Sequence, residues 1–154
     1  MDRELTFRRA RPSEVIAVRE LITRSMAYWD RPPAYLDEAR SLMSLSGEDI
    51  ERDEAWVLDS GEQIVGFLRV SVSGADAEIE EFHLEPAWIG RGLGRRLFER
   101  AVEAARTLGA DRLVWSTDQH ALGFYLAMGG IVTGSTASGI AGDEPLTSME
   151  LGLT

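Results

Sequence analysis

The sequence contains no cysteine. This absence excludes disulfides, thiolate metal sites and any acyl transfer that passes through an acyl-cysteine intermediate. With only two histidines in addition, the chain has too few soft ligands for a metal cluster. We therefore expect no metal site.

Long apolar runs are also missing. No stretch of the chain is long enough to span a bilayer, and the charged segment Met1 to Arg11 lacks the apolar core of a signal peptide. We expect the N-terminus to belong to the fold and the protein to be cytoplasmic. No repeat, low-complexity tract or long linker divides the 154 residues, so a single domain over 1–154 is predicted.

Basic residues are few relative to acidic ones. The chain has 16 Lys and Arg residues and 26 Asp and Glu residues, which gives a formal net charge of −10. Such a surface repels nucleic acid and anionic membranes, so neither is expected as a partner. It suits a cationic substrate such as an amine, although most of these charges are expected simply to solvate the surface.

Hydrophobic periodicity and turn signals predict an α/β fold with a mixed (α+β) sheet in the order β-α-α-β-β-β-α-β-α-β-β. The first helix is expected to open at Pro12-Ser13-Glu14, with Ser13 as its N-cap. The other predicted helices cover 34–45, 92–108 and 121–128, and the predicted strands cover 5–9, 54–58, 63–72, 75–84, 112–116, 131–136 and 147–152.

A glycine-rich turn, Gly90-Arg91-Gly92-Leu93-Gly94-Arg95-Arg96, lies between a predicted strand and a strongly periodic helix. Glycines let a ligand approach the backbone closely, and the first N–H groups of a helix bind anions. Three arginines add positive charge, which suits a pyrophosphate. A dinucleotide fingerprint would need glycine where Arg95 stands, and a Walker-type Gly-Lys-Ser/Thr sequence is absent. A purely structural tight bend is the alternative.

Together with the preceding Phe82-His83-Leu84-Glu85-Pro86, this turn resembles the acyl-CoA motif of the GNAT N-acetyltransferase superfamily. The resemblance implies the GNAT-like acyl-CoA N-acyltransferase fold, with acetyl-CoA as co-substrate. It implies pyrophosphate binding by backbone N–H groups from Ile89 to Arg95, and pairing of the Phe82, His83 and Leu84 backbone with the pantetheine arm. The residues expected to contact the cofactor are Phe82, His83, Leu84, Ile89, Gly90, Arg91, Gly92, Leu93, Gly94, Arg95, Asp118 and Phe124. The family's leading Gln or Arg is Ile89 here, and Arg91 is the residue expected to compensate.

The segment from Ala121 to Gly130 resembles the C-terminal signature of the same superfamily. Asp118, which is expected to cap the predicted helix 121–128, stands where the family usually has Asn, and Gly130 replaces a final aromatic residue. By resemblance, Tyr125 is the general acid that protonates the departing CoA thiolate. A tyrosine hydroxyl is a neutral donor at neutral pH, which suits that role. The alternative for Tyr125 is a core aromatic residue that packs beside Phe124.

An amine attacks a thioester only in its neutral form, so a base is required. Glu78 and Glu80 match positions where some GNAT enzymes carry a glutamate, and they are the predicted catalytic bases. Strand alternation places Glu78 and Glu80 on one face with Phe82 and Leu84, unless a bulge changes the register. His83 can also titrate near neutrality, but its backbone is expected to matter more. His120 is expected to line the site.

The predicted function is therefore transfer of an acetyl group from acetyl-CoA to a primary amine by direct attack in a ternary complex. The amine belongs to a small molecule or a peptide. By resemblance, the segment 28–45, with Tyr28, Trp29, Tyr35, Asp37 and Glu38, forms the acceptor side, and its composition equally suits an amphipathic helix that packs on the sheet. A non-catalytic acyl-CoA-binding sensor or regulatory module is the alternative. A homodimer is expected from resemblance only.

Overall fold

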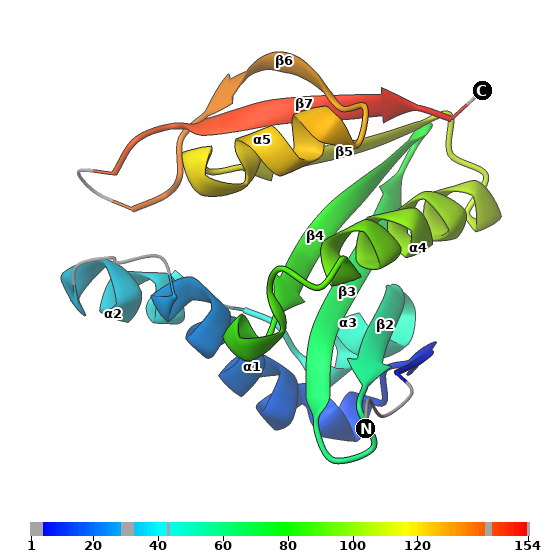
Figure 1. Cartoon of the computed structure of the whole chain (residues 1–154). Coiled ribbons are helices and arrows are strands. Elements are labelled where there is room, and N and C mark those ends of the chain that lie inside the picture. The colour runs from blue at the N-terminus through cyan, green and yellow to red at the C-terminus, as the bar shows by residue number, and fades with distance from the viewer. Residues whose placement is uncertain (1–4, 29–32, 43, 141–142, 154) are drawn as a thin grey trace.

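A computed structural model of the chain describes residues 5–28, 33–42, 44–140 and 143–153, without the side chains of residues 33, 38 and 40–42. One seven-stranded sheet organises these residues in the order β1-β2-β3-β4-β5-β7-β6 (Figure 1). All neighbouring strands are antiparallel except β4 and β5. The sheet is therefore mixed, as the sequence predicts.

The strands are β1 (Thr6–Arg9), β2 (Glu54–Asp59), β3 (Ile64–Ser73), β4 (Asp76–Leu84), β5 (Arg112–Thr117), β6 (Ile131–Thr136) and β7 (Leu146–Gly152). The helices are α1 (Val15–Ala27), α2 (Pro33–Leu42), α3 (Gly47–Arg52), α4 (Leu93–Thr107) and α5 (Gln119–Ala127), with short 3-10 turns η1 (Pro12–Glu14) and η2 (Pro86–Trp88). None of the described helices is long and apolar enough to cross a membrane.

The predicted order is confirmed, with two differences near the N-terminus. Helix α3 is not predicted, although Ser46 and Asp49 cap it reciprocally: Ser46 Oγ accepts from the Asp49 N–H at 3.2 Å, and Asp49 accepts from the Ser46 N–H at 2.9 Å. The Ser13 N-cap is wrong. Ser13 lies inside η1, where the Glu14 carboxylate accepts from the Arg11 N–H at 2.8 Å.

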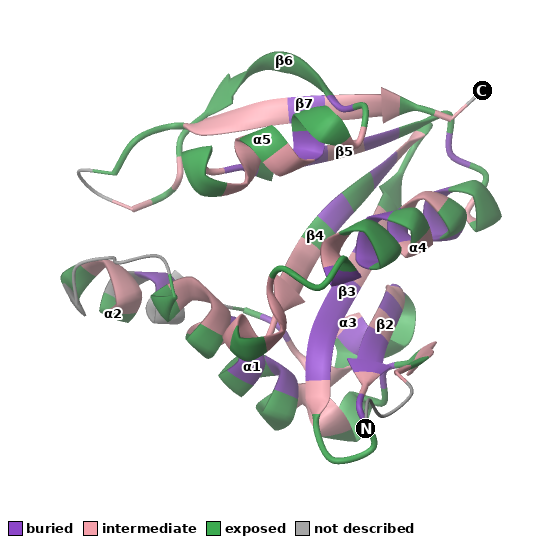
Figure 2. Ribbon diagram, in the orientation of Figure 1, coloured by how far each residue is buried: buried purple, intermediate pink, exposed green. Residues whose placement is uncertain are grey.

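Buried side chains form two hydrophobic cores, one on each face of the sheet (Figure 2). One lies under α4 and includes Leu68, Ile79 and Leu97, and the other lies under α1 and α3 and includes Phe67 and Val18. Because Phe67 and Leu68 are neighbours, β3 is buried on both faces, and it forms the rigid centre of the sheet.

Strands β4 and β5 pair over only three residues each, Asp76–Glu78 with Arg112–Val114. Beyond this point β5 stays paired with β7 as far as Thr117, and the two parallel strands diverge (Figure 1). The edge of β4 that faces β5 is therefore open from Ile79 onward. The functional site lies in this opening.

A β-bulge lies in β4 beside the opening. Arg69 of β3 pairs with Glu81 while Val70 pairs with Ile79, so Glu80 is an extra residue. After the bulge, Phe82 packs on the core under α4, the same core that contains Ile79. The expected common face for Glu80 and Phe82 is therefore wrong, because the extra residue reverses the alternation.

Candidate functional site

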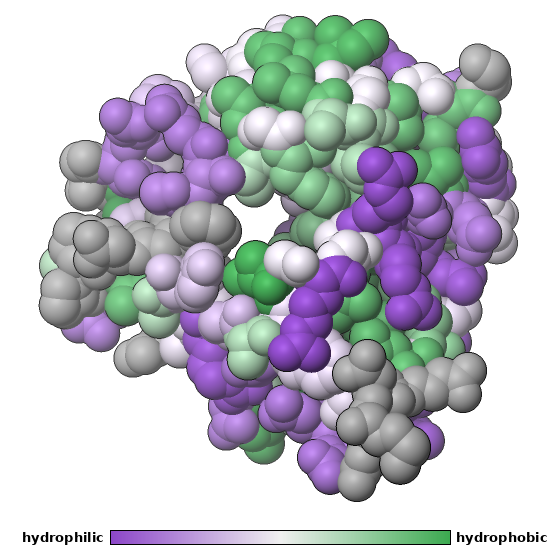
Figure 3. Space-filling model, viewed as in Figure 1, coloured by the Kyte–Doolittle hydropathy of each residue, from purple (hydrophilic) through white to green (hydrophobic). Residues whose placement is uncertain are grey.

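Two cavities lie in the opening between β4 and β5, and the space-filling view shows a hollow between the two halves of the molecule (Figure 3). The first, which we call the glycine-turn cavity, has a volume of about 400 Å³ and is bounded by Ile89, Gly90, Gly92, Gly94 and Arg95. The second, the acidic cavity, measures about 340 Å³ and is bounded by Glu80, Glu81, His83 and Asp118. Four residues line both cavities: Ser25, Phe82, Ala121 and Tyr125.

The glycine turn bends sharply into α4. Gly90 and Gly92 have φ angles of 86° and 77°, which favour glycine, and Gly92 is the N-cap of α4. Glycine is needed at position 94 for a steric reason, because a Cβ there would lie 3.1 Å from Cε1 of Phe124. Glycine at 94 therefore lets Phe124 of α5 pack over the first turn of α4, so the two helices meet across the opening.

The first N–H groups of α4 lack acceptors within the helix and carry the positive end of its dipole. This arrangement suits the predicted anion site, with one exception. The Ile89 N–H donates to the Pro86 carbonyl at 3.2 Å, so it is already used. The side chain of Leu93 is buried in the core, so only its backbone is available to a ligand.

The three arginines of the turn point in different directions. Arg95 lines the glycine-turn cavity. The Arg91 guanidinium stacks over the Trp88 ring at 4.7 Å from its centroid, and that of Arg96 lies 5.7 Å from the centroid of Phe7 in β1. Of the three, Arg95 is the one that borders the glycine-turn cavity. Binding of one anion by all three charges, with Arg91 compensating for the side chain missing at Ile89, stays a prediction.

The open edge of β4 presents backbone groups in alternation. The Glu85 N–H donates to the Val65 carbonyl of β3 at 2.8 Å, which fixes the parity of the strand. By that parity the backbone of His83 faces β3, whereas the N–H and C=O groups of Phe82 and Leu84 face the opening. An extended ligand can therefore pair with Phe82 and Leu84, but not with the His83 backbone.

Tyr125 lies at the junction of the two cavities, on α5. Its side chain packs edge-on against Phe82 and Phe98 and lies tilted beside Trp115, with ring centroids 5.3–6.1 Å away. Only 7% of the residue is exposed, and its hydroxyl makes no hydrogen bond to any residue that the structure describes. Burial, with a smaller contribution from the charge of Asp118, raises the pKa of the phenol above its ordinary value of 10.0, so Tyr125 keeps its proton.

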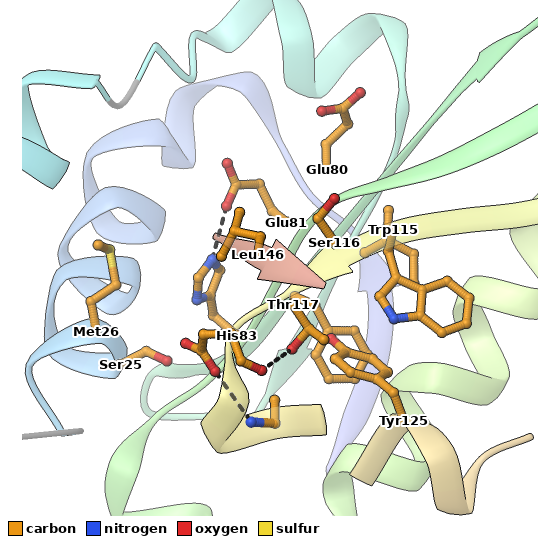
Figure 4. A pocket seen from close by; sticks show the side chains of 14 residues that line it. Ser25, Met26, Glu80, Glu81, His83, Trp115, Ser116, Thr117, Tyr125 and Leu146 are labelled. Carbon is orange, nitrogen blue, oxygen red and sulfur yellow. Dashed lines mark hydrogen bonds and ion pairs between the residues drawn. The ribbon is translucent and has the colours of Figure 1, made fainter. Parts of the chain in front are cut away.

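A carboxylate–histidine pair faces the acidic cavity. Glu81 and His83 point toward one another, with 2.8 Å between Oε2 and Nε2 (Figure 4). Both side chains are 19% exposed, and both come from β4 after the bulge. A carboxylate that binds one ring nitrogen fixes the tautomer and leaves the other nitrogen as an acceptor. Strand alternation puts Glu81 and His83, two residues apart, on one face, so the sequence carries a local signal for this pair.

The two predicted bases, Glu78 and Glu80, differ in their position relative to the cavities. Glu78 does not border either cavity. Partial burial, followed by the charge of Glu80, raises its pKa. Glu80 borders the acidic cavity, where its carboxylate accepts from the Ser71 hydroxyl at 2.8 Å and points away from the Glu81–His83 pair (Figure 4).

Asp118 has a structural task as well. Its carboxylate accepts from the Ala121 N–H at 3.2 Å and caps α5, as the sequence predicts. It borders the acidic cavity and not the glycine-turn cavity, so a cofactor contact for Asp118 does not follow from its position. His120 borders the glycine-turn cavity, where it is expected.

Helix α1 supplies an unpredicted wall. Ser25 borders both cavities and Met26 the acidic one. Arg24 on the same helix makes hydrogen bonds of 2.8–3.0 Å to both oxygens of Glu85, which docks α1 against the end of β4. Of the predicted acceptor segment, Trp29 and the Glu38 side chain lie outside the described residues. Tyr28 is half exposed and borders neither cavity.

Comparisons with known proteins agree with this geometry. The family model described as the acetyltransferase (GNAT) family matches residues 16–129. The PaiA N-acetyltransferase of Thermoplasma acidophilum, in complex with coenzyme A, is 15% identical, with a TM-score of 0.80 over 97% of this chain and 99% of that one. YncA of Salmonella typhimurium, with its cofactor acetyl-CoA, is 22% identical, with a TM-score of 0.71 over 98% of this chain and 95% of that one. The ribosomal-protein-S18-alanine N-acetyltransferase of Escherichia coli is 16% identical, with a TM-score of 0.72 over 98% and 95%.

The family model covers well over half of the sequence, so the chain belongs to the acetyltransferase (GNAT) family. It is an acyltransferase whose fold matches solved acetyltransferase structures over nearly its whole length. Within the part of the chain that the structure describes, no group of three or more His, Asp or Glu side chains is placed to hold a metal ion.

Proposed function

We propose that this protein transfers the acetyl group of acetyl-CoA to a primary amine by direct attack within a ternary complex. The observation that carries the proposal is the meeting of the glycine-turn cavity and the acidic cavity at Tyr125. Acetyl-CoA enters along the glycine turn, and the amine enters through the acidic cavity. The thioester then lies between the open edge of β4 and the Tyr125 hydroxyl.

The cofactor is held mainly by backbone groups. N–H groups from Gly92 to Arg95 bind the pyrophosphate, with the Arg95 side chain beside them. The outward backbone groups of Phe82 and Leu84 pair with the pantetheine arm, and Phe124 forms the apolar wall. The Leu84 N–H meets the oxyanion that develops as the amine attacks.

The chemistry moves two protons. The neutral amine nitrogen forms a bond to the thioester carbon, and the amine proton passes directly or through water to a base. The C–S bond then breaks, and Tyr125 donates its proton to the departing thiolate. The burial that raises the pKa of Tyr125 keeps the phenol protonated until the thiolate forms. The phenolate left by the transfer then takes a proton from solvent, which restores the acid for the next turnover.

We assign the base role to His83, held by Glu81, and not to the predicted Glu78 or Glu80. His83 borders the cavity that the amine enters, whereas Glu78 does not, and Glu80 lies at the end of that cavity away from Tyr125 (Figure 4). No observation favours the alternative of a non-catalytic acyl-CoA sensor, which uses the glycine turn without Tyr125 or a base.

Acetyl-CoA binding is tested first, by thermal melts with and without the ligand. At a concentration about 100 times Kd, a ligand that binds only the folded state stabilises it by about 2.7 kcal/mol. For a domain of this size that corresponds to a rise in Tm of roughly 5–10 °C. Free acetate is the control. No rise at saturating acetyl-CoA would refute the cofactor.

Tyr125→Phe then tests the chemistry. The variant should turn over about 100-fold more slowly, because a positioned general acid contributes roughly 10²–10⁴-fold. Its acetyl-CoA melt shift should match that of the wild type, since no described residue depends on the hydroxyl. Full turnover in Tyr125→Phe would show that the thiolate takes its proton elsewhere.

The cytoplasmic location and the homodimer remain predictions. Strand β6 is the outer strand of the sheet and exposes Ile131 and Val132 by 61% and 50%, so it is the edge at which we expect two copies to pair. Sedimentation of the purified chain, with and without acetyl-CoA, decides the oligomeric state.

A further inference from the structure

The acidic cavity is arranged for a molecule with more than one positive charge. Building on the proposed function, we propose that the acceptor is a small aliphatic diamine or polyamine. One of its nitrogens is acetylated beside Tyr125, and a second, as an ammonium group, is bound by Glu80.

The first support is the charge of the cavity wall. Glu80, Glu81 and Asp118 all border it, and no arginine does among the residues that the structure describes. The chain contains no lysine at all. Glu80 bonds to the Ser71 hydroxyl and Glu81 to His83, and neither forms an ion pair with an arginine in the described part of the chain. Arg52 and Arg69 line a separate cavity with Glu80, but their described ion pairs are with Asp49 and Asp53.

Neighbouring carboxylates repel each other in a partly desolvated site. Burial raises the pKa of Glu78 on the same strand, and the charge of Glu80 raises it further, which is the direction that repulsion between the two carboxylates gives. A bound ammonium relieves it, whereas a carboxylate on the substrate adds to it. The cavity thus selects by the sign of the charge at the far end of the acceptor.

The second support comes from Tyr125. The residue is more than nine-tenths buried, its hydroxyl has no partner among the described residues, and it borders the same cavity. Glu80 lies at the opposite end of the opening from Tyr125 (Figure 4). The apolar side chains of Met26, Trp115 and Leu146 border the cavity too, where methylene groups can pack. A volume of about 340 Å³ is near the lower end of ligand pockets, roughly 300–1,000 Å³. A small, linear acceptor with two charged ends fits this arrangement.

The test compares three amines that share one reacting end and one chain length. Diaminobutane, aminobutanol and aminobutyrate carry a positive, a neutral and a negative group at the other end. Turnover is followed as thiol release from acetyl-CoA. Because the chain has neither cysteine nor lysine, it adds no thiol signal and no side-chain acceptor of its own.

We expect kcat/KM for diaminobutane to exceed that for aminobutanol by at least about tenfold, and aminobutyrate to be the poorest substrate. The advantage of the diamine should shrink as salt is added, since screening weakens partly exposed charge pairs. Equal kcat/KM for diaminobutane and aminobutanol would overturn the proposal.

Glu80→Gln separates charge recognition from chemistry. If Glu80 binds the second ammonium, the variant loses most of the preference for diaminobutane and keeps its rate with aminobutanol. If Glu80 is instead the base, the rates with both amines fall together, and this assignment of Glu80 is overturned. Glu99→Gln, an exposed change on α4, is the matched control and should alter neither rate.

Binding provides a second readout that needs no turnover. Diaminobutane should raise the Tm of the complex with coenzyme A, and aminobutanol should raise it less. If the diamine neither reacts nor stabilises the complex while acetyl-CoA still raises the Tm, the acceptor class is wrong and the cofactor stands. If acetyl-CoA itself has no effect, the proposed function has failed.

Discussion

Gly130→Ala should destabilise the protein, although glycine to alanine is usually a mild change. Gly130 is buried just after α5, at the position where the family signature has an aromatic residue. A Cβ there would lie 2.7 Å from Cζ2 of Trp115 and 3.1 Å from Cε of Met149. Trp115 of β5 therefore occupies the space that a side chain at 130 would need.

The magnitude follows from how little the indole can move. Trp115 is packed between Phe98 and Tyr125, with ring centroids at 5.5 and 5.3 Å, and only 3% of it is exposed. Overpacking a site of this kind costs about 1–3 kcal/mol. At roughly 2–4 °C per kcal/mol, the Tm should fall by about 2–12 °C. Gly130 does not have a positive φ, so this cost is steric and not conformational.

Gly123→Ala is the matched control, because Gly123 lies inside α5 with nothing within 4 Å of a built Cβ. That change should stabilise the protein by up to about 1 kcal/mol. Trp115→Phe should rescue Gly130→Ala, since it removes the atoms in conflict and an indole N–H that has no described partner. Urea unfolding of the double-mutant cycle measures the coupling. If Gly130→Ala costs the same stability with and without the Trp115→Phe change, the steric argument is refuted.

Two further predictions concern β4. His83→Gln should lower kcat by about 100-fold, because a positioned base contributes roughly that much, and should leave acetyl-CoA binding unchanged. Glu81→Gln should lower kcat by a smaller factor, since Glu81 acts through His83. Full activity in His83→Gln, with a loss of activity in Glu80→Gln, would return the role of base to Glu80. Glu78→Gln should raise the Tm near neutral pH. The carboxyl of Glu78 has a raised pKa in the folded state, so it stabilises the fold when the pH is below its ordinary pKa of 4.5. That stabilisation is lost as the pH rises through the folded-state pKa. The difference between Glu78→Gln and wild-type melts should therefore vanish at acidic pH, and a pH-independent difference would contradict the assignment.

The sequence predicts those parts of the site that depend on local signals. A few neighbouring residues are enough to recognise the glycine turn, the Asp118 cap and the helix that carries Tyr125. The structure brings these three features together around one opening. The predicted place of the turn between β4 and α4 is confirmed. Local signals suffice here because turn geometry and capping are decided by neighbours in the chain.

Side-chain direction is not a local property, and prediction from sequence fails there. Arg91 and Arg95 occupy equivalent positions beside the glycines in the sequence. In the structure Arg91 stacks on Trp88, whereas Arg95 lines the glycine-turn cavity. Ser25 gives no signal at all, because its position depends on how α1 docks through Arg24 and Glu85. These are packing decisions between segments far apart in the chain, which periodicity does not encode.

One inserted residue explains most of what the site can do. The bulge at Glu80 lies just past Glu78, the last β4 residue to pair with β5, and bulges increase local twist where strands separate. The same insertion directs Phe82 toward the core under α4 and α5 and leaves Glu81 and His83 on the other side of the strand. A single strand thus supplies an apolar wall to the glycine-turn cavity and a charged wall to the acidic cavity. Without the extra residue, alternation would move each of these side chains to the opposite face, and the apolar and charged walls would be exchanged.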